Sequence, residues 1–260
     1  ARNGIAGFCV GLDNGVIRLF LRPFTYLLKR SLLIVEEAGQ IKTELTSKKI
    51  YLVRHGQTDF NLKGIVQGSG IDSSLNERGR AQPTAFHNCY RSVQSSKLYT
   101  SKVKRTVETV QPFIDDGIPY ESIDGLNEIS WGTKEGQGIT PEEDAYYHWM
   151  LKQWQAGRTD LRIEGGESPD DVARRQLPAI EKIMGTPDEP AVLVCMHGRA
   201  MRILLCQLLH YPLGAMDMFE HENLCLYVLN YAGAVFSVEK FNNTAHLDLL
   251  APVVNSDPVK

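Results

Sequence analysis

Two runs of apolar residues stand out along the chain, and each leads into a histidine. The run at residues 50–53 is followed by Arg54 and His55, and the longer run at residues 191–196 is followed by His197. Uninterrupted apolar runs of this kind are typical of strands in a sheet that is covered on both faces. In open α/β sheets, ligands bind just beyond the carboxyl ends of the strands. We therefore predict that the two histidines, 142 positions apart, converge on one crevice.

The remaining pattern alternates between helical and strand segments. It predicts helices at about residues 76–92, 101–113, 168–184 and 199–209, and strands at 97–100, 118–123, 224–230 and 234–241. Asn76 and Ser101 are the expected N-caps of the first two helices, and Pro83 is expected to kink or split the first. Residues 133–170 contain Gly, Pro and aromatic residues and are expected to form an irregular or helical insertion over the active site. The predicted fold class is α/β, a three-layer α/β/α sandwich with a mostly parallel central sheet.

The first 47 residues differ from the rest of the chain. Their apolar stretch at residues 16–35 is interrupted by Pro23 and by charges, so it lacks the roughly 20 uninterrupted apolar residues of a membrane span. Charges inside the apolar part also argue against a secretory signal peptide, and an amphipathic helix on the domain or on a membrane surface is one alternative. A start at Ala1 instead of Met is typical of a fragment, a processed chain or an expression product. We expect an N-terminal extension of uncertain structure at 1–47, a catalytic domain at 48–250 and a C-terminal tail at 251–260.

Composition narrows the class of protein without naming a function. The hydrophobic share of 43% and the charged share of 23% are those of a globular protein that folds in water. A net charge of -3 produces no field that favours nucleic acid, so any anion must be bound by local clusters of Arg. The five cysteines are scattered and lack CxxC spacing, which argues against disulfides and a zinc site and favours a cytoplasmic location. Cys195 and Cys225 lie in apolar runs and are expected to be packing residues.

The tripeptide Arg54-His55-Gly56 combines three properties that phosphate chemistry uses. Arg offers a planar guanidinium to phosphate oxygens, His offers a ring nitrogen that can act as a nucleophile, and Gly lets the backbone approach an anion closely. Asn61 adds a neutral donor that could reach the same anion. The alternative is an Arg-His pair that caps a strand and bonds to carbonyls, with Asn61 as a turn former.

Five motifs in the same order resemble those of the histidine phosphatase superfamily. They are Leu52-Val53-Arg54-His55-Gly56-Gln57-Thr58 with Asn61; Ser101-Lys102-Val103-Lys104-Arg105-Thr106 with Thr109; Leu126-Asn127-Glu128-Ile129 with Gly132 and Gly136; Gly165-Gly166-Glu167-Ser168; and Val194-Cys195-Met196-His197-Gly198. The similarity covers roughly residues 49–230. It implies the phosphoglycerate mutase-like α/β fold of that family.

The resemblance implies a role for each matched polar residue. The catalytic set is His55, Glu128 and His197, and the phosphate-binding set is Arg54, Asn61, Arg105 and Gly198. His55 is expected to be a neutral nucleophile, oriented by a backbone carbonyl such as that of Gly56, and His197 to be protonated. Glu128 is expected to protonate the leaving alcohol. No metal and no cofactor are expected, because two Arg residues supply the positive charge that phosphoryl transfer needs.

The other acids and histidines receive lesser roles. Asp72 and Glu135 are weaker candidates for the acid, and Glu167 is expected to begin the helix near residue 168, where a carboxylate meets the positive end of the helix dipole. The five remaining histidines, which match no motif, are left out of the mechanism: His87, His148, His210, His221 and His246.

The predicted function is that of a phosphomonoesterase acting through a phosphohistidine on a small phosphorylated metabolite, as a metal-independent hydrolase of the histidine acid phosphatase type. A phosphoglycerate mutase is the first alternative, although Ile-Ser-Trp-Gly follows Glu128 where mutases resemble one another in an Arg-His-Tyr-Gly stretch. A phospho-ligand or protein-binding module on the same fold is the second, although the pocket's Arg and His residues are all present. We expect no nucleic acid partner and no membrane span. The sequence leaves open the substrate and the oligomeric state, with a homodimer among the options.

Overall fold

The computed structural model describes residues 47–250 except 94, 139, 234 and 249, together with four short strands within residues 1–46. The chain divides into two compact units, residues 1–46 and 47–260. The strands of the first unit form two antiparallel pairs, β1 (Val10–Asp13) with β2 (Val16–Leu19) and β3 (Ile34–Glu37) with β4 (Gln40–Thr43). The ends of the apolar stretch at 16–35 are therefore strands and not helix, while residues 20–33 and the tail at 251–260 lie outside the described residues.

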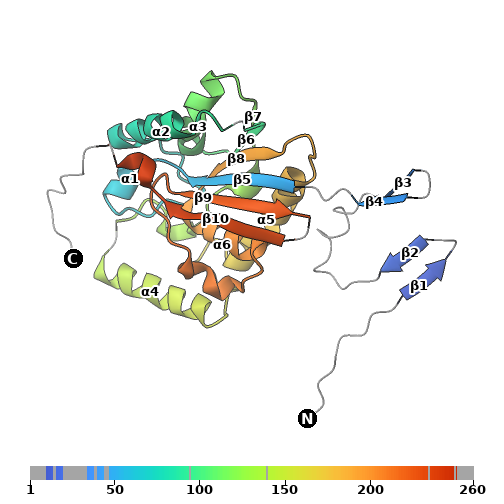
Figure 1. The fold of residues 1–260 in the computed structure, drawn as a ribbon. Coiled ribbons are helices and arrows are strands. Elements are labelled where there is room, and N and C mark those ends of the chain that lie inside the picture. Colours follow the sequence, from blue (N-terminus) through green and yellow to red (C-terminus); the bar gives the residue numbers. More distant parts are fainter. Residues whose placement is uncertain are drawn as a thin grey trace, which may run out of the picture. The chain divides into compact units, whose positions relative to one another are not determined.

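A mixed six-stranded sheet forms the centre of the second unit (Figure 1). Its strands are β5 (Ser47–Arg54), β6 (Lys97–Thr100), β7 (Tyr120–Ser122), β8 (Ala191–Met196), β9 (Leu226–Ala232) and β10 (Val235–Asn243), in the order β10-β9-β5-β8-β6-β7. β5, β8, β6 and β7 are parallel, whereas β9 and β10 are antiparallel to their neighbours. The predicted α/β class with a mostly parallel sheet is confirmed, and the two antiparallel strands form one edge.

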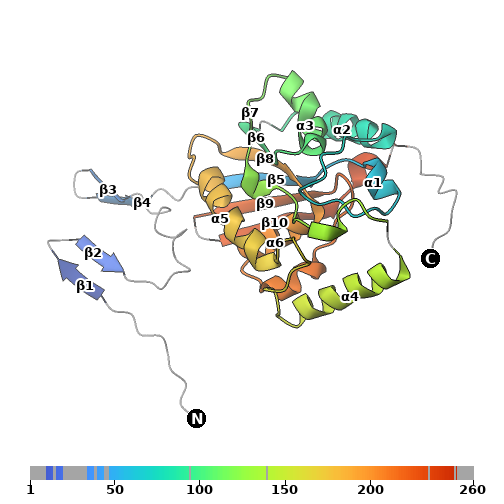
Figure 2. The same ribbon diagram turned by 180° about the vertical axis from the view of Figure 1, so that it is seen from behind.

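Helices cover both faces of this sheet (Figures 1 and 2). α2 (Glu77–Tyr90) and α3 (Lys104–Asp115) lie on one face, and α5 (Pro169–Met184) and α6 (Gly198–Leu208) lie on the other. Alternate residues of β8 divide between two apolar cores, with Val192 and Val194 in one and Leu193 and Cys195 in the other. This alternation explains why β8 is apolar throughout, because both of its faces are buried.

The insertion expected at residues 133–170 contains α4 (Pro141–Gln155), which lies outside the two helix layers (Figure 2). Thr140 caps this helix by accepting from the N–H of Glu143, and Pro141 at the first position has no N–H that would need an acceptor. Met150 and Trp154 are buried and join the apolar core. One face of α4 therefore anchors the insertion while the rest of the helix stays exposed.

The parallel pairing of β5 with β8 brings the two predicted histidines together. Arg54 is paired with Met196 at the end of an unbroken register, so His55 and His197 follow at equivalent positions. The N–H of His55 also donates to the carbonyl of Met196 at 3.0 Å. The predicted convergence of the two strand ends is therefore observed.

The first turns of α2 pack closely against the loop that follows β5. The helix begins as predicted, with the side chain of Asn76 accepting from the N–H of Gly79 at 2.8 Å. Pro83 does not split the helix, which continues past it. Pro83 has no N–H for the carbonyl of Gly79, and a Cβ on Gly56 would lie only 2.7 Å from that carbonyl oxygen. Glycine at position 56 therefore permits this close approach.

The start of α3 differs from the prediction. Ser101 is not the N-cap, because the helix begins at Lys104 and the hydroxyl of Ser101 is bonded to Thr106 at 2.9 Å and to His197 at 2.8 Å. The N–H of Lys104 instead donates to the carboxylate of Asp72 at 2.7 Å. An acid from another loop supplies the acceptor that the sequence assigned to Ser101.

We expect Gly79→Ala to lower the free energy of unfolding by about 1 to 3 kcal/mol, the usual cost of overpacking. A Cβ at this position would overlap the backbone carbonyl of Gln57, which cannot move without displacing the loop after β5. Urea denaturation measures the difference. Gly138→Ala is the matched control, because no described atom lies within 4 Å of the Cβ that it would add. Equal stability of the two variants would contradict this packing.

Candidate active site

His55 and His197 lie side by side after β5 and β8, with ring centroids 5.2 Å apart. The Nδ1 atom of His55 lies 2.7 Å from the carbonyl oxygen of Gly56. A carbonyl oxygen only accepts, so Nδ1 carries the proton and Nε2 keeps its lone pair. The expected orientation of His55 by Gly56 is observed, and Nε2 is the nitrogen that can attack phosphorus.

Burial keeps His55 uncharged. Its side chain is 2% exposed, and desolvation lowers the pKa of its imidazole well below the usual value of 6.5. The positive charges of Arg105 and Arg54 lower this pKa further, against the smaller opposing effect of the Gly56 hydrogen bond. The imidazole is therefore neutral at physiological pH, as a nucleophile must be.

His197 is also neutral in this structure, whereas the sequence analysis expected it to be protonated. The Nε–H of Arg105 donates to Nδ1 of His197 at 3.2 Å, so that nitrogen carries no proton. Nε2 then carries the proton and donates to the hydroxyl of Ser101 at 2.8 Å. Complete burial, followed by the charge of Arg105, lowers the pKa of His197 well below its usual value. A second proton is costly because two guanidinium charges already surround the ring.

Two arginines bring positive charge to the histidine pair. Arg105, in the first turn of α3, is fully buried and donates to the carbonyls of Ile71 at 2.5 Å and Gly68 at 3.1 Å. Burial lowers the pKa of Arg105 to about 10, which leaves it charged at neutral pH. Arg54 donates to the carbonyl of His221 at 3.3 Å, while its buried Nε has no hydrogen-bond acceptor within the described part of the chain. A buried donor of this kind is suited to binding an anion.

Glu128 reaches the same place from the loop after the short 3-10 helix η2 (Asp124–Leu126). Its Oε1 accepts from the N–H groups of Ile129 at 2.9 Å and Ala200 at 2.8 Å, and its Oε2 accepts from the N–H of Arg199 at 3.1 Å. The carboxyl group thus caps the N-terminus of α6, whose first amides have no partner within the helix. Oε2 accepts one of these three bonds, so it is the oxygen with room for a proton.

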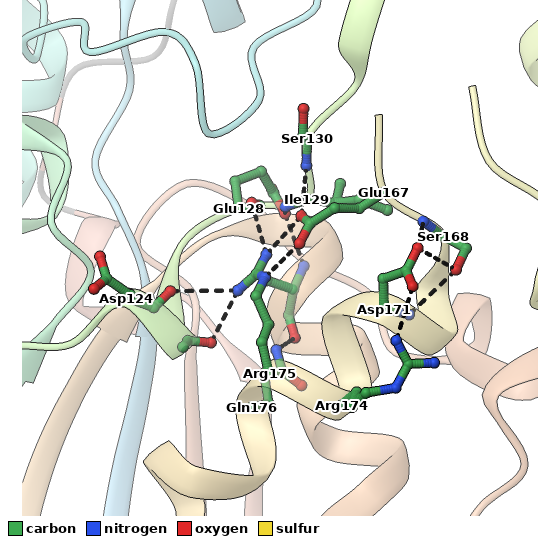
Figure 3. A network of polar contacts seen from close by, with 12 residues as sticks. Asp124, Glu128, Ile129, Ser130, Glu167, Ser168, Asp171, Arg174, Arg175 and Gln176 are labelled. Carbon is green, nitrogen blue, oxygen red and sulfur yellow. Dashed lines mark hydrogen bonds and ion pairs between the residues drawn. The ribbon is translucent and has the colours of Figure 1, made fainter. Parts of the chain in front are cut away.

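A salt bridge fixes the backbone around Glu128 (Figure 3). Arg175 of α5 pairs with Glu167 at 2.7 Å and donates to the carbonyl of Glu128 at 2.9 Å. Glu167 in turn accepts from the N–H of Ser130 at 2.9 Å. The expectation that Glu167 begins the helix is wrong, because Ser168 caps α5 and the carboxylate of Glu167 turns toward the loop that carries Glu128.

Two asparagines hold the loop of His55. Oδ1 of Asn61 accepts from the N–H of Thr58 at 3.1 Å, which completes the capping box of α1 (Asp59–Leu62). Asn223 donates to Oδ1 of Asn61 at 3.2 Å and to the carbonyl of His55 at 3.1 Å. Since the oxygen of Asn61 is committed to these contacts, its NH₂ group is the part that can reach an anion.

A pocket of about 310 Å³ opens beside these groups. Four of the predicted residues line it: Arg54, Asn61, Glu128 and Gly198. The other three, His55, Arg105 and His197, are buried next to this wall and do not line the pocket. The structure therefore brings all the predicted residues into one neighbourhood and keeps both imidazoles out of bulk water.

His221 was left out by the sequence analysis, yet it borders the residues that are predicted to bind phosphate. It lines the pocket, and a Cβ on Gly198 would lie 2.6 Å from its Nε2. Burial, followed by the charge of Arg54, lowers the pKa of His221 to about 2. No motif marks His221 or Asn223, because their loop reaches the site only through the return of β9 beside β5. Their position just before a strand predicted to close the sheet is the one signal that could have found them.

Further properties of the described residues bear on the predicted class of protein. Cys195 and Cys225 are buried free thiols, as expected of packing residues, and burial raises the pKa of Cys225 to about 11. Within the same part of the chain, no three His, Cys, Asp or Glu side chains gather so that they could hold a metal ion. No described helix has the length and apolar character needed to cross a membrane.

Comparison with known families agrees with this geometry. The pattern of the histidine phosphatase superfamily (branch 1) matches residues 50–244. The chain belongs to the histidine phosphatase superfamily. The predicted family is thereby confirmed.

Relatives within the superfamily differ in their described activities. The chain is 35% identical over 172 residues to 6-phosphofructo-2-kinase/fructose-2,6-bisphosphatase of Gallus gallus, covering 65% of this chain and 34% of that protein. It therefore spans about a third of the length of that relative. It is 31% identical over 212 residues to a probable phosphoglycerate mutase, GpmB, of Yersinia pestis (strain Pestoides F), covering 78% of this chain and 96% of that protein. Among solved structures, Bacillus stearothermophilus YhfR matches with a TM-score of 0.67 and 27% identity, over 77% of this chain and 100% of that chain.

We expect the stability of this histidine phosphatase superfamily member to fall as the pH drops below 6.5, because His55, His197 and His221 stay neutral when folded but bind protons when unfolded. Each contributes a slope of about 1.4 kcal/mol per pH unit between the unfolded and folded pKa values. His221→Gln should reduce the slope of unfolding free energy against pH by about this amount. Urea denaturation at several pH values from 7.5 to 5 measures both slopes. If the unfolding free energies of the wild type and of His221→Gln change in parallel with pH, His221 is not a neutral, buried group in the folded protein.

Proposed function

We propose that this chain is a phosphomonoesterase in which His55 takes up the phosphoryl group. The observation that carries the proposal is the state of His55, a buried neutral imidazole whose Nδ1–H donates to Gly56 at 2.7 Å. This leaves the lone pair of Nε2 for attack, beside the guanidinium groups of Arg54 and Arg105. A module that only binds phosphate would need the arginines but not an imidazole held in one tautomer.

In the first step, Nε2 of His55 attacks phosphorus in line with the leaving oxygen. The N–P bond forms as the P–O bond breaks, and Arg54 and Arg105 meet the negative charge on the nonbridging oxygens. Oε2 of Glu128 gives its proton to the departing alkoxide. The phosphoryl charge offsets the arginines, so we expect the pKa of His197 to rise while substrate is bound and this ring to become a further donor.

In the second step, water hydrolyses the phosphohistidine. The carboxylate of Glu128 takes a proton from the attacking water, the N–P bond breaks, and inorganic phosphate leaves. His55 returns to its neutral form because the Gly56 carbonyl holds the same tautomer throughout. The backbone amides of α6 hold Glu128 in place for both proton transfers.

A phosphoglycerate mutase is the second candidate, because a probable mutase matches this chain at 31% identity over 96% of its own length. A mutase must bind the carboxylate of a phosphoglycerate, which calls for an available cation. Arg175 pairs with Glu167 at 2.7 Å and Arg174 pairs with Asp171 at 3.0 Å. The commitment of both arginines to acids of the protein supports hydrolysis over transfer to a sugar acid.

The size and charge of the site support a small phosphorylated substrate and catalysis without a metal or cofactor. The pocket of about 310 Å³ has room for one small leaving group. Arg54 and Arg105 supply the positive charge that a metal ion would otherwise bring. We place the activity in the cytoplasm, because Cys89, Cys195, Cys206 and Cys225 are free thiols.

Phosphate release from a panel of monoesters, with and without EDTA, tests the proposed function. We expect turnover that EDTA does not change, and a phosphorylated intermediate that survives alkali and is labile in acid. His55→Ala should abolish both turnover and labelling while leaving the fold intact, because the backbone bonds of residue 55 to Met196 and Asn223 do not need its side chain. Turnover by a clean His55→Ala preparation would show that His55 is not the nucleophile. Strict dependence on Mg²⁺ would show that Arg54 and Arg105 do not supply the positive charge that the reaction needs.

Glu128→Gln should separate leaving groups by their need for a proton. An alkyl phosphate should be slowed by about 10² to 10⁴ fold, the usual range for general acid catalysis, whereas an aryl phosphate with an acidic phenol should suffer far less. Single-turnover measurement of alcohol and phenol release avoids masking by slow hydrolysis of the phosphohistidine. Equal losses for both substrates would refute Glu128 as the acid.

A further inference from the structure

The part of the pocket that receives the leaving group has its cations already paired. Besides Arg54, the cations that line the pocket are Lys134 and Arg199. Nζ of Lys134 pairs with Glu143 of α4 at 2.7 Å and lies 5.6 Å from the ring centre of Tyr146. The charge of Lys134 is therefore matched by a carboxylate that lines the same pocket.

The guanidinium of Arg199 has more partners within the protein than the ammonium of Lys134. Its Nη1 pairs with Asp217, and its Nη2 donates to the hydroxyl of Tyr147 at 3.0 Å. Its side chain is 4% exposed, and its guanidinium lies 5.6 Å from the ring centre of Trp154. Arg199 thus contributes to the wall of the pocket without presenting a free charge to a ligand.

The remaining lining is apolar, neutral or acidic. The aromatic residues of the lining are Phe60 of α1, Trp131, and Tyr146 and Tyr147 of α4. The neutral polar groups are the amides of Gln67 and Gln137 and the ring of His221, whose pKa is about 2. Glu143 is joined on α4 by a second carboxylate, that of Asp144. Away from the phosphoryl group, the field of the pocket therefore does not favour an anion.

We propose that the leaving alcohol is uncharged and presents an apolar or aromatic face to α4, and that the Lys134–Glu143 pair excludes alcohols that carry a carboxylate or a second phosphate. A second anion would have to break this pair or lose its hydration without a counter-charge, and both are costly. The substrates are then monophosphate esters of neutral, partly apolar alcohols. This inference rests on the proposed function and narrows its substrate class.

Benzyl phosphate and its 4-carboxy derivative form a matched pair for the test. They differ by one carboxylate far from the ester bond, so their alcohols leave with nearly the same ease. We expect the wild-type protein to favour benzyl phosphate in kcat/KM by about tenfold or more, the effect of burying a charge without a partner. p-Nitrophenyl phosphate serves as the reference substrate that reports phosphatase activity itself.

Glu143→Gln removes the partner of Lys134 and should narrow the preference for benzyl phosphate over its 4-carboxy derivative by about fivefold. This factor corresponds to the upper end of the free energy that one partly exposed ion pair contributes. Glu142→Gln is the matched control, because it removes the same charge from the next position of α4 but does not line the pocket. It should leave the ratio of the two substrates unchanged. Asp144→Asn, which removes the other α4 carboxylate of the lining, should also narrow the ratio of the two substrates, and it serves if Glu143→Gln fails to fold.

The outcomes separate this inference from the proposed function. No hydrolysis of any of the three esters would overturn both. If p-nitrophenyl phosphate is hydrolysed but the two benzyl esters react at equal rates, the inference of an uncharged leaving alcohol is wrong while the proposed function stands. The same conclusion follows if neither benzyl ester is hydrolysed. The third outcome concerns the ratio of kcat/KM for benzyl phosphate to that for its 4-carboxy derivative. If Glu143→Gln and Asp144→Asn show the same ratio as Glu142→Gln, then Glu143 and Asp144 are not the cause of the preference.

Discussion

The in-register pairing of β5 with β8 is the constraint on which the site depends. Arg54 and Met196 are the last paired residues of this register. The residues that follow them, His55 and His197, therefore lie side by side with ring centroids 5.2 Å apart. The pairing is held by apolar side chains on both faces of the strands, each fully buried one contributing about 1.5–3 kcal/mol. This apolar support lets the protein keep costly polar groups buried at the strand ends.

The electrostatics of the site follow from that burial. Two guanidinium groups stand beside two imidazoles, and both desolvation and the neighbouring positive charge lower the pKa values of the imidazoles. One ring is held by a carbonyl and the other by Arg105 and Ser101, so each has a defined tautomer. Among the described residues, no acceptor contacts Arg54 Nε, and the bond of His55 to Gly56 leaves its Nε2 with a lone pair. Under the proposed function, a phosphoryl group would accept from Arg54 Nε and receive the lone pair of His55.

The insertion at residues 133–170 adds the aromatic and acidic side of the pocket. α4 is anchored by Met150 and Trp154 and presents Glu143 and Asp144 toward the pocket. Because Glu143 pairs with Lys134, the insertion removes a cation from the leaving-group side while Arg54 keeps one on the phosphoryl side. Under the proposed function, the phosphoryl end and the leaving-group end of one pocket thus differ in charge, so the insertion would contribute to the choice of substrate.

The sequence by itself determined the features that depend on local pattern. Apolar runs predicted β5 and β8 and the histidines at their ends, Asn76 and Ser168 lie at helix starts as their side chains favour, and ordered motifs placed Glu128 with the arginines.

Only the tertiary structure decided how acceptors and donors from distant segments are shared. Arg105 donates to Nδ1 of His197, Asp72 caps α3 in place of Ser101, and Glu167 pairs with Arg175 instead of starting a helix. His221 and Asn223 reach the site through the return of β9, at a distance in sequence that no local period encodes. The physical reason is competition: a side chain's preference is local, but the partner that it takes depends on which other groups the fold brings within hydrogen-bond distance.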